Sequence, residues 1–345
     1  MNNNLRHFLV SHPFLLKKIF FIKRTMVSKK FNHEVFERQN TNLFNIDLLS
    51  EDMIFCPFDY VVDNHAYGIN ATLKSYSGLD VSFECNSVFM EHGVYFGDYV
   101  STDLAFYKNV PKIITFSETR VNHLRESGCN KTIYPIGPYI QYANNLKSDE
   151  ENACIKKKYG RILLCFPPHS VAGVNSDFSK MEYILEIKKI AKHYDSVFIN
   201  LYYLDAQKPD VVQFYQSNNF HIVTAGHKND INFLNRLRTI IELADMTMSN
   251  AVGTHVGYCI ALNKPHYIYP QETKRWYGNA KDEKHFAANI RQESSVVYQQ
   301  ETSEVKNSFS VYNTSILNNQ LEVVKKYWGP LSPVSQKDIN TLLLT

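Results

Sequence analysis

The sequence lacks most of the short motifs that mark common enzyme classes. It has no G-x-x-x-x-G-K-[ST] phosphate loop, no G-x-G-x-x-G after its first predicted strand and no G-x-S-x-G nucleophile turn. No two aspartates are spaced as D-x-D, and the 13 histidines include no H-x-x-x-H or H-E-x-x-H pair. These absences argue against each of those chemistries and against zinc. We therefore expect neither a metal nor a cofactor.

Cysteine is scarce, and neither sign of charge is in strong excess. The six cysteines form no C-x-x-C, which predicts buried free thiols in a reducing, cytoplasmic environment. The formal net charge is +3, with an isoelectric point near 8.3, which is too mild for a dedicated nucleic-acid binder. Hydrophobic residues make up 44% of the 345 residues, so the chain can bury a large core, and its length predicts two domains.

The N-terminal segment, residues 1–24, has no long uninterrupted hydrophobic run. His12 and Pro13, then Lys17 and Lys18, cut its apolar stretches, and no A-x-A-like cleavage site follows. This pattern is a poor match to a signal peptide or a membrane span. Two readings stay open: an ordinary helix packed on the domain, or a basic, apolar segment lying on the cytoplasmic face of the inner membrane.

What the sequence does contain is a regular alternation of strands and helices in its second half. Strands are predicted at 161–166, 196–203, 221–226, 245–249 and 265–270, and helices at 180–194, 210–219, 229–244 and 253–263. This alternation indicates a parallel sheet covered by helices on both faces.

The first half is less regular but similar in kind. Strands are predicted at 52–58, 87–90, 112–117 and 131–137, and helices at 65–76 and 118–127, the latter capped by Ser117 and ended by Gly128. The polar stretch 142–160 is read as a linker. The predicted division is residues 1–145, residues 146–328 and a tail at 329–345, with a helix near 315–330 crossing back to the first domain. Two such units facing each other enclose a cleft, and ligands bind beyond the carboxyl ends of their strands.

The first polar cluster after a strand is Glu91-His92-Gly93. Glu91 is a candidate general base for an acceptor hydroxyl, with His92 as its neighbour and competitor. Gly93 turns the chain, and Tyr95 and Phe96 can stack on an acceptor sugar. The alternative is a glutamate that caps a helix or pairs with an arginine.

The second cluster follows the strand at 161–166, where two prolines present His169 and Ser170 to a phosphate or a ribose. The alternative is an ordinary surface loop.

The third cluster, SNAVGTH at 249–255, joins a strand end to a helix start, where backbone N–H groups attract anions. Its candidate phosphate-binding residues are Ser249, Asn250, Gly253, Thr254 and His255, and the alternative is a plain helix cap.

Two longer stretches, ITFSETRVNHLRESGCNKTIYPIGPYI and SNAVGTHVGYCIALNKPHYIYP, resemble the end of the acceptor domain and the donor-domain signature of GT-B glycosyltransferases. Within that fold, the order EHG, PHS, SNAVGTH is similar to the motifs of bacterial sialyltransferases and related surface-polysaccharide transferases, with one acid where those carry two and Ser170 where they carry proline. The resemblance implies an α/β, GT-B chain of two Rossmann-like domains. It maps the base onto Glu91, a donor-phosphate contact onto His169 and a nucleotide-phosphate contact onto Ser249.

The function that this resemblance implies is transfer of a sugar from a CMP-, UDP-, GDP- or dTDP-linked donor to a lipid-linked or oligosaccharide acceptor of O-antigen, capsule or lipooligosaccharide. Three alternatives remain: a sugar-nucleotide 2-epimerase, a CDP-polyol phosphotransferase of the same fold, and a non-catalytic glycan- or nucleotide-binding protein.

Overall fold

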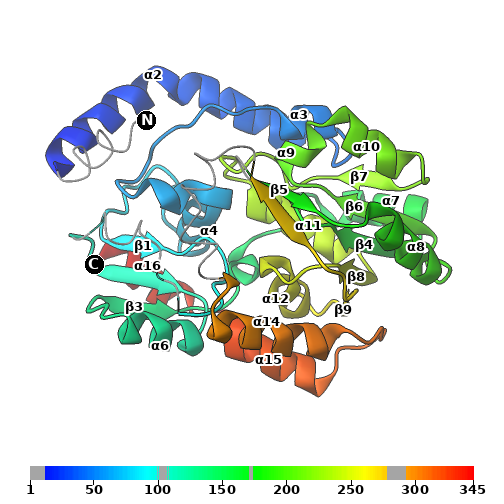
Figure 1. The fold of residues 1–345 in the computed structure, drawn as a ribbon. Coiled ribbons are helices and arrows are strands. Elements are labelled where there is room, and N and C mark those ends of the chain that lie inside the picture. Colours follow the sequence, from blue (N-terminus) through cyan, green and yellow to red (C-terminus); the bar gives the residue numbers. More distant parts are fainter. Residues whose placement is uncertain (1–11, 99, 101–106, 108, 171–173, 278–292) are drawn as a thin grey trace.

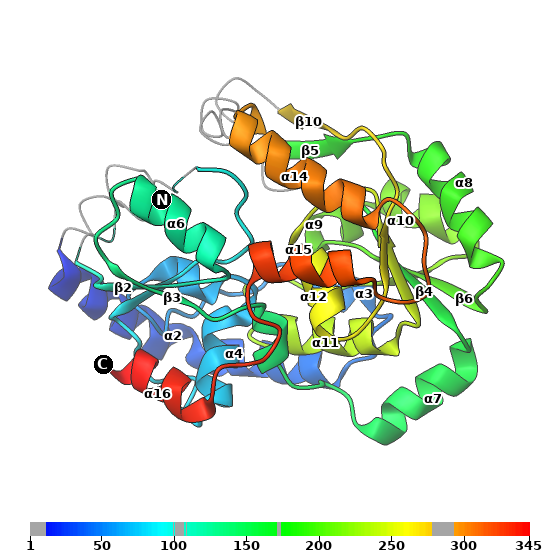
Figure 2. The same ribbon diagram turned by 90° about the horizontal axis from the view of Figure 1, so that it is seen from below.

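Two parallel sheets lie at the centre of the computed structural model, which describes residues 12–98, 100, 107, 109–170, 174–277 and 293–345. Helices surround both sheets, and a small antiparallel strand pair lies apart from them (Figures 1 and 2). The predicted α/β class with two parallel sheets is therefore confirmed.

The N-terminal sheet has the strand order β1-β2-β3, and all its strands are parallel. Ser117 caps the helix after β2 by accepting the N–H of Arg120, and Gly128, with φ of 85°, follows its end, as predicted. The elements of this half are α2(Pro13–Asn40), α3(Ile46–Ser50), the 3-10 helix η1(Val62–Gly68), α4(Ile69–Tyr76), β1(Val88–Met90), β2(Lys112–Thr115), α6(Glu118–Glu126), β3(Thr132–Pro135) and the 3-10 helix η2(Tyr139–Tyr142).

The C-terminal sheet has the order β7-β6-β4-β8-β9, again all parallel. This is the strand order 3-2-1-4-5 of a doubly wound Rossmann-like sheet. Its elements are α7(Asp149–Tyr159), β4(Ile162–Phe166), α8(Lys180–Ala191), β6(Ser196–Asn200), α9(Tyr203–Ala206), α10(Pro209–Gln216), β7(His221–Val223), α11(Phe233–Leu243), β8(Met246–Ser249), α12(Thr254–Ala261) and β9(His266–Ile268). The five strands predicted here are all confirmed.

Three segments differ from expectation. Residues 52–58 form no strand, because Met53 and Cys56 pack against Phe31 and Val35 of α2 instead. The polar stretch read as a linker contains α7, which begins with a capping box. The strands β5(Val174–Asp177) and β10(Lys274–Tyr277) form an antiparallel pair that we did not predict.

The C-terminal helices tie the two halves together. They are α14(Val296–Phe309), α15(Asn318–Trp328) and α16(Gln336–Leu344). Helix α15 lies between α6 and α12 (Figure 2). Its Lys326 O accepts a hydrogen bond from Thr119 Oγ1 of α6 at 2.8 Å. The predicted tail contains α16, which packs near α4 and accepts a hydrogen bond from Lys112 Nζ at Leu342 O, 2.9 Å. The end of the chain thus returns to the first half.

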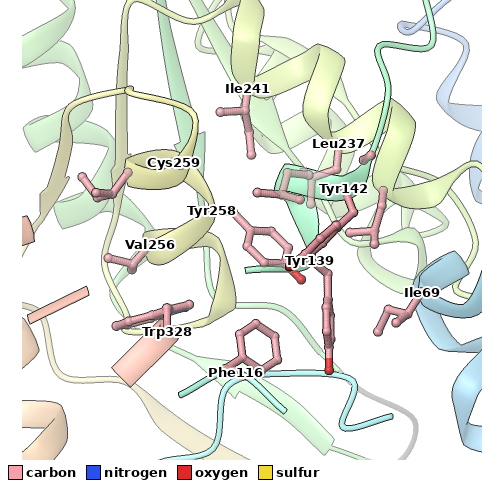
Figure 3. Close-up of a cluster of buried hydrophobic side chains, with 14 of the residues drawn as sticks. Ile69, Phe116, Tyr139, Tyr142, Leu237, Ile241, Val256, Tyr258, Cys259 and Trp328 are labelled. Atoms are coloured by element: carbon pink, nitrogen blue, oxygen red, sulfur yellow. The ribbon is translucent and has the colours of Figure 1, made fainter. Parts of the chain in front are cut away.

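The core is continuous between the two sheets. Figure 3 shows Val256 and Tyr258 of α12 near Trp328 of α15 and Phe116, the residue after β2. A Cβ at Gly257 would lie 2.2 Å from the Trp328 ring, so α15 packs directly on the backbone of α12. The two units are held in one arrangement by this packing.

The cysteines are all free, as predicted, but Cys154 is exposed and Cys129 half-buried rather than buried. Within the described residues, no helix combines the length and the apolar character that crossing a bilayer requires.

Candidate functional site

The strand order of the C-terminal sheet reverses between β4 and β8. From β4 the chain adds β6 and β7 on one side, whereas β8 and β9 lie on the other. Ligands of doubly wound sheets bind beyond the strand ends at this switch point. The register pairs Phe166 with Ser249, so the predicted clusters at 167–170 and 250–255 leave the sheet side by side. The stacking of His255 on Phe166, with centroids 4.9 Å apart, joins them directly.

The start of α12 carries the features of an anion site. Among the described residues, no side chain caps this helix, and its N-cap residue is Gly253. The first N–H groups of an α-helix have no partner within the helix and, together with its dipole, attract negative charge. This end of α12 therefore offers backbone donors at the switch point.

The loop after β1 reaches the same place from the other sheet. The N–H of Val94 donates to Thr254 Oγ1 at 3.2 Å, and a Cβ at Gly93 would lie 3.2 Å from that same oxygen. The structure thus brings the first predicted cluster to the third.

Glu91 is buried in an ion pair rather than open to a substrate. Arg120 Nη2 donates to its Oε1 at 2.6 Å, Arg120 Nε lies 3.1 Å from both carboxylate oxygens, and Thr115 Oγ1 donates to Oε2 at 2.6 Å. Burial lowers the pKa of Arg120, but the charge of Glu91 outweighs this effect and raises that pKa above its usual value. Both oxygens of this buried carboxylate are thus engaged by Arg120 and Thr115.

His92 is half-buried and lies in a line of aromatic rings. Its ring centroid is 6.1 Å from that of Tyr67, which is 6.4 Å from Tyr202, which in turn is 4.8 Å from His169. The line connects the loop after β1 with the loop after β4. Burial raises the pKa of both tyrosines, so they remain neutral hydrogen-bonding groups at physiological pH.

Tyr67 has a backbone conformation that is rare for a bulky residue. Its φ is 60°, and its N–H donates to Lys228 O at 2.7 Å. Such strained positions cluster at functional sites. Neither Tyr67 nor Tyr202 was among our candidates. The strand-end rule points to Tyr202, which follows β6 closely, but no pattern in the sequence indicates Tyr67.

Ser249 and Asn250 are not placed as phosphate donors. Ser249 is fully buried, and its Oγ donates to Ala251 O at 2.9 Å and lies 3.0 Å from His266 Nε2. Asn250 is also buried, and its Nδ2 donates to Gln271 Oε1 at 2.7 Å. Both side chains hold the turn after β8 together, so the phosphate contacts we predicted for them do not agree with the structure.

The loop after β4 is braced by a buried acid. The N–H of Ser170 donates to Asp205 Oδ2 at 2.8 Å, and Lys208 Nζ donates to Ser170 Oγ at 3.1 Å and to Asp205 Oδ1 at 2.9 Å. His169 is exposed beside them. Lys208, which lies between α9 and α10, adds a partly exposed cation near the switch point, and the strand-end rule does not reach it.

His255 is held neutral. Burial, followed by the influence of His169, lowers the pKa of His255 to about 3, and its Nε2 has no hydrogen-bond partner among the described residues. The ring also hydrogen-bonds the backbone of Ala251, which takes up the one N–H of the neutral imidazole, so Nε2 is an acceptor at the start of α12.

The aromatic residues of the loop after β1 divide into two roles. Tyr95 is partly exposed, and the Arg120 guanidinium lies 4.8 Å from its ring centroid. Phe96 is buried against Tyr327 and Trp328, with centroids 5.4 and 5.5 Å away. The expectation that Phe96 stacks on an acceptor therefore disagrees with the structure, whereas part of the Tyr95 side chain is exposed.

Within the described residues, no group of three or more His, Cys, Asp or Glu side chains is arranged to hold a metal ion.

No known family model and no curated protein matches this sequence. Among solved structures, the wall teichoic acid polymerase TagF is 13% identical, with 75% of this chain and 69% of that chain covered and a TM-score of 0.34. The UDP-GlcNAc 2-epimerase from Methanocaldococcus jannaschii is 10% identical, with 80% of each chain covered and a TM-score of 0.38. The sucrose-phosphate synthase from Thermosynechococcus elongatus is 12% identical, with 74% and 65% covered and a TM-score of 0.32. These scores carry no argument about function, and the fold class rests on the sheet topology above.

Proposed function

We propose that the protein is a metal-independent, GT-B-type glycosyltransferase that moves a sugar from a nucleotide-activated donor to a hydroxyl of a surface glycan. The observation that supports this most strongly is the hydrogen bond from Val94 to Thr254, because it sets the His92 loop beside the uncapped start of α12. In this proposal His92 is the proton acceptor and the start of α12 is the anion site, both near the switch point of the sheet.

The donor phosphate would lie on the first N–H groups of α12. Gly253 leaves room for its approach, and His169 and Lys208 supply donors from the neighbouring loops. The nucleotide can be a CMP, UDP, GDP or dTDP derivative. The acceptor would be a lipid-linked or free oligosaccharide, reached from the cytoplasmic side and stacked on Tyr95.

Of the pair Glu91 and His92, the contacts favour His92 as the general base and Glu91 as the counter-ion that positions Arg120. In the reaction, the acceptor hydroxyl gives its proton to His92, and its oxygen bonds to the anomeric carbon. The bond from that carbon to the phosphate oxygen breaks, and the phosphate leaves with the electron pair, stabilised by the N-terminus of α12.

The assay that tests this function measures release of free nucleotide from CMP-, UDP-, GDP- and dTDP-sugars, with and without an oligosaccharide acceptor. Acceptor-dependent release from one donor supports the proposal. Conversion of a sugar nucleotide without acceptor would assign an epimerase instead, and release of CMP from a CDP-polyol alone would assign a polyol phosphotransferase. Nucleotide binding with none of these activities would leave a binding protein.

A further inference from the structure

Helix α2 has two apolar faces, one buried against the protein and one exposed. Leu16, Phe31 and Val35 form the inner face and are buried against the body. The outer face carries apolar side chains spaced i, i+4, i+7, i+11, the repeat of a single helical stripe. Its members are exposed by 41, 39, 58 and 79%: Leu15, Ile19, Ile22 and Met26. Figure 1 shows α2 along the outer edge of the molecule.

The charge of this helix is of one sign. The chain has no acidic residue before Glu34, and α2 up to that point carries six basic residues: Lys17, Lys18, Lys23, Arg24, Lys29 and Lys30. Arg24 pairs with Glu84 and Lys30 with Glu34, and all five lysines are exposed. Because the whole chain has a net charge of only +3, the rest of the protein is net acidic, and the positive charge is concentrated on this edge.

An open cavity lies at the N-terminal end of the same helix. It has a volume of about 430 Å³ and is lined by Phe14, Lys17, Lys18, Phe21, Ile22 and Glu84. Apolar rings beside ammonium groups suit the boundary between acyl chains and phosphate headgroups, where lysine extends its apolar stem and keeps its charge in water.

We propose that α2 docks the protein on the surface of an anionic lipid bilayer. The helix lies in the plane of the interface, its outer apolar stripe enters the headgroup boundary, and the flanking lysines contact lipid phosphates. The charge decides between occupants. A second copy of this chain would oppose one lysine-rich helix with another, whereas an anionic bilayer complements both the charge and the stripe. This inference does not depend on the transferase chemistry.

The first test is flotation of the full chain with two kinds of vesicle, phosphatidylcholine alone and phosphatidylcholine mixed with phosphatidylglycerol. The protein should float with the anionic vesicles, less so as salt is raised, and not with the neutral ones. The double variant Ile22→Glu/Met26→Glu should lose this binding. A matched control exists on α8, where Met181 and Leu185 have the same i, i+4 spacing and are 59 and 64% exposed. Met181→Glu/Leu185→Glu should float like the wild type.

The charge is tested separately. Lys18→Glu/Lys29→Glu should weaken vesicle binding at least tenfold, since each basic residue near an anionic surface contributes roughly fivefold. Lys189→Glu on α8 is the control and should have little effect. Thermal unfolding and nucleotide binding of each variant show that the fold and the proposed donor site are intact.

Three outcomes would overturn the proposal: equal binding to neutral vesicles, equal losses in the α2 and α8 variants, or sedimentation showing that the α2 stripe variant turns a dimer into a monomer. The last result would assign the face to a second copy of the chain. If the α2 variants lose vesicle binding but keep nucleotide binding, the result supports docking of α2 on a bilayer even if the transferase assignment fails.

Discussion

The N–H of Val94 and the Oγ1 of Thr254 are hydrogen-bonded at 3.2 Å, and this contact joins a loop of the N-terminal sheet to the first residue of α12 in the C-terminal unit. The Thr254 hydroxyl therefore accepts from the loop and does not cap its own helix. The N–H groups at the start of α12 are consequently left to a ligand, while the loop that carries His92 is held beside them.

Replacing Thr254 with valine should therefore separate binding from turnover. The variant keeps the shape of the side chain but removes the acceptor for Val94. A net hydrogen bond contributes about 0.5–1.5 kcal/mol, so steady-state kinetics should show turnover falling about three- to tenfold while nucleotide affinity is retained. Thr119→Val, which removes the hydrogen bond to Lys326 on α15, is the control and should keep turnover. Loss of nucleotide affinity in Thr254→Val would mean that its hydroxyl binds the donor.

His92→Asn should lower turnover about 10²- to 10⁴-fold with little change in nucleotide affinity or stability, as expected for loss of a general base. Steady-state kinetics and urea unfolding of the same preparation measure both quantities.

Glu91→Gln is the matched comparison. It leaves the buried Arg120 without its counter-ion, so its main effect should be on stability, a loss of about 3–5 kcal/mol. A Gln variant that folds with unchanged stability but has lost turnover would restore Glu91 as the base and remove His92 from that role.

The C-terminal helices should be required for folding, because α15 fills the space over α12. Trp328 is fully buried against Gly257, and Trp328→Ala should destabilise the protein by about 3–5 kcal/mol in urea unfolding. Leu344→Ala, at an exposed position on α16, should change little. Deleting everything after Ser315 removes both α15 and α16 and should abolish soluble expression. A soluble, active truncated protein would show that neither helix supports the core.

Stability should fall as the pH drops from about 6.5 towards 4. Burial lowers the pKa of His227 to about 4 and that of His255 to about 3, and it also lowers the pKa values of His65 and His266. These side chains are neutral in the folded state but gain a proton in the unfolded chain below about pH 6.5. The unfolded state then binds more protons, so acid favours it.

Urea unfolding at pH 7, 6 and 5 measures this slope. His227→Gln should flatten it, because the variant removes one of the buried neutral histidines. A slope of zero in the wild type would contradict the buried neutral state of these histidines.

The regular part of the fold was predictable because its signals are local. The strands and helices of the C-terminal sheet follow from apolar runs of the right length and period, and the cap of α6 follows from Ser117. The strand predicted at 52–58 failed because its apolar side chains pack on α2, a partner that only the tertiary structure shows.

The location of the candidate site was predictable, but the role of each side chain in it was not. Residues after strand ends do converge at the switch point, since this follows from the topology of parallel sheets. The roles of individual side chains depend on contacts from distant segments. Arg120 forms an ion pair with Glu91, His266 lies within hydrogen-bond distance of Ser249, and Trp328 of α15 packs on Phe96. Such pairings have no short-range pattern in the sequence.

The central claim is that a nucleotide phosphate binds at the start of α12, and Gly253 tests it most directly. Gly253 has an extended backbone that any residue can adopt, but its Cβ would lie 3.0 Å from the His255 ring. The measurement is the thermal stability of the wild type and of Gly253→Val with CMP, UDP, GDP and dTDP. One nucleotide should stabilise the wild type by roughly 2.7 kcal/mol at a hundred times its Kd, and the folded variant should lose this gain. Equal stabilisation of both proteins, or none of the wild type by any nucleotide, would contradict the account.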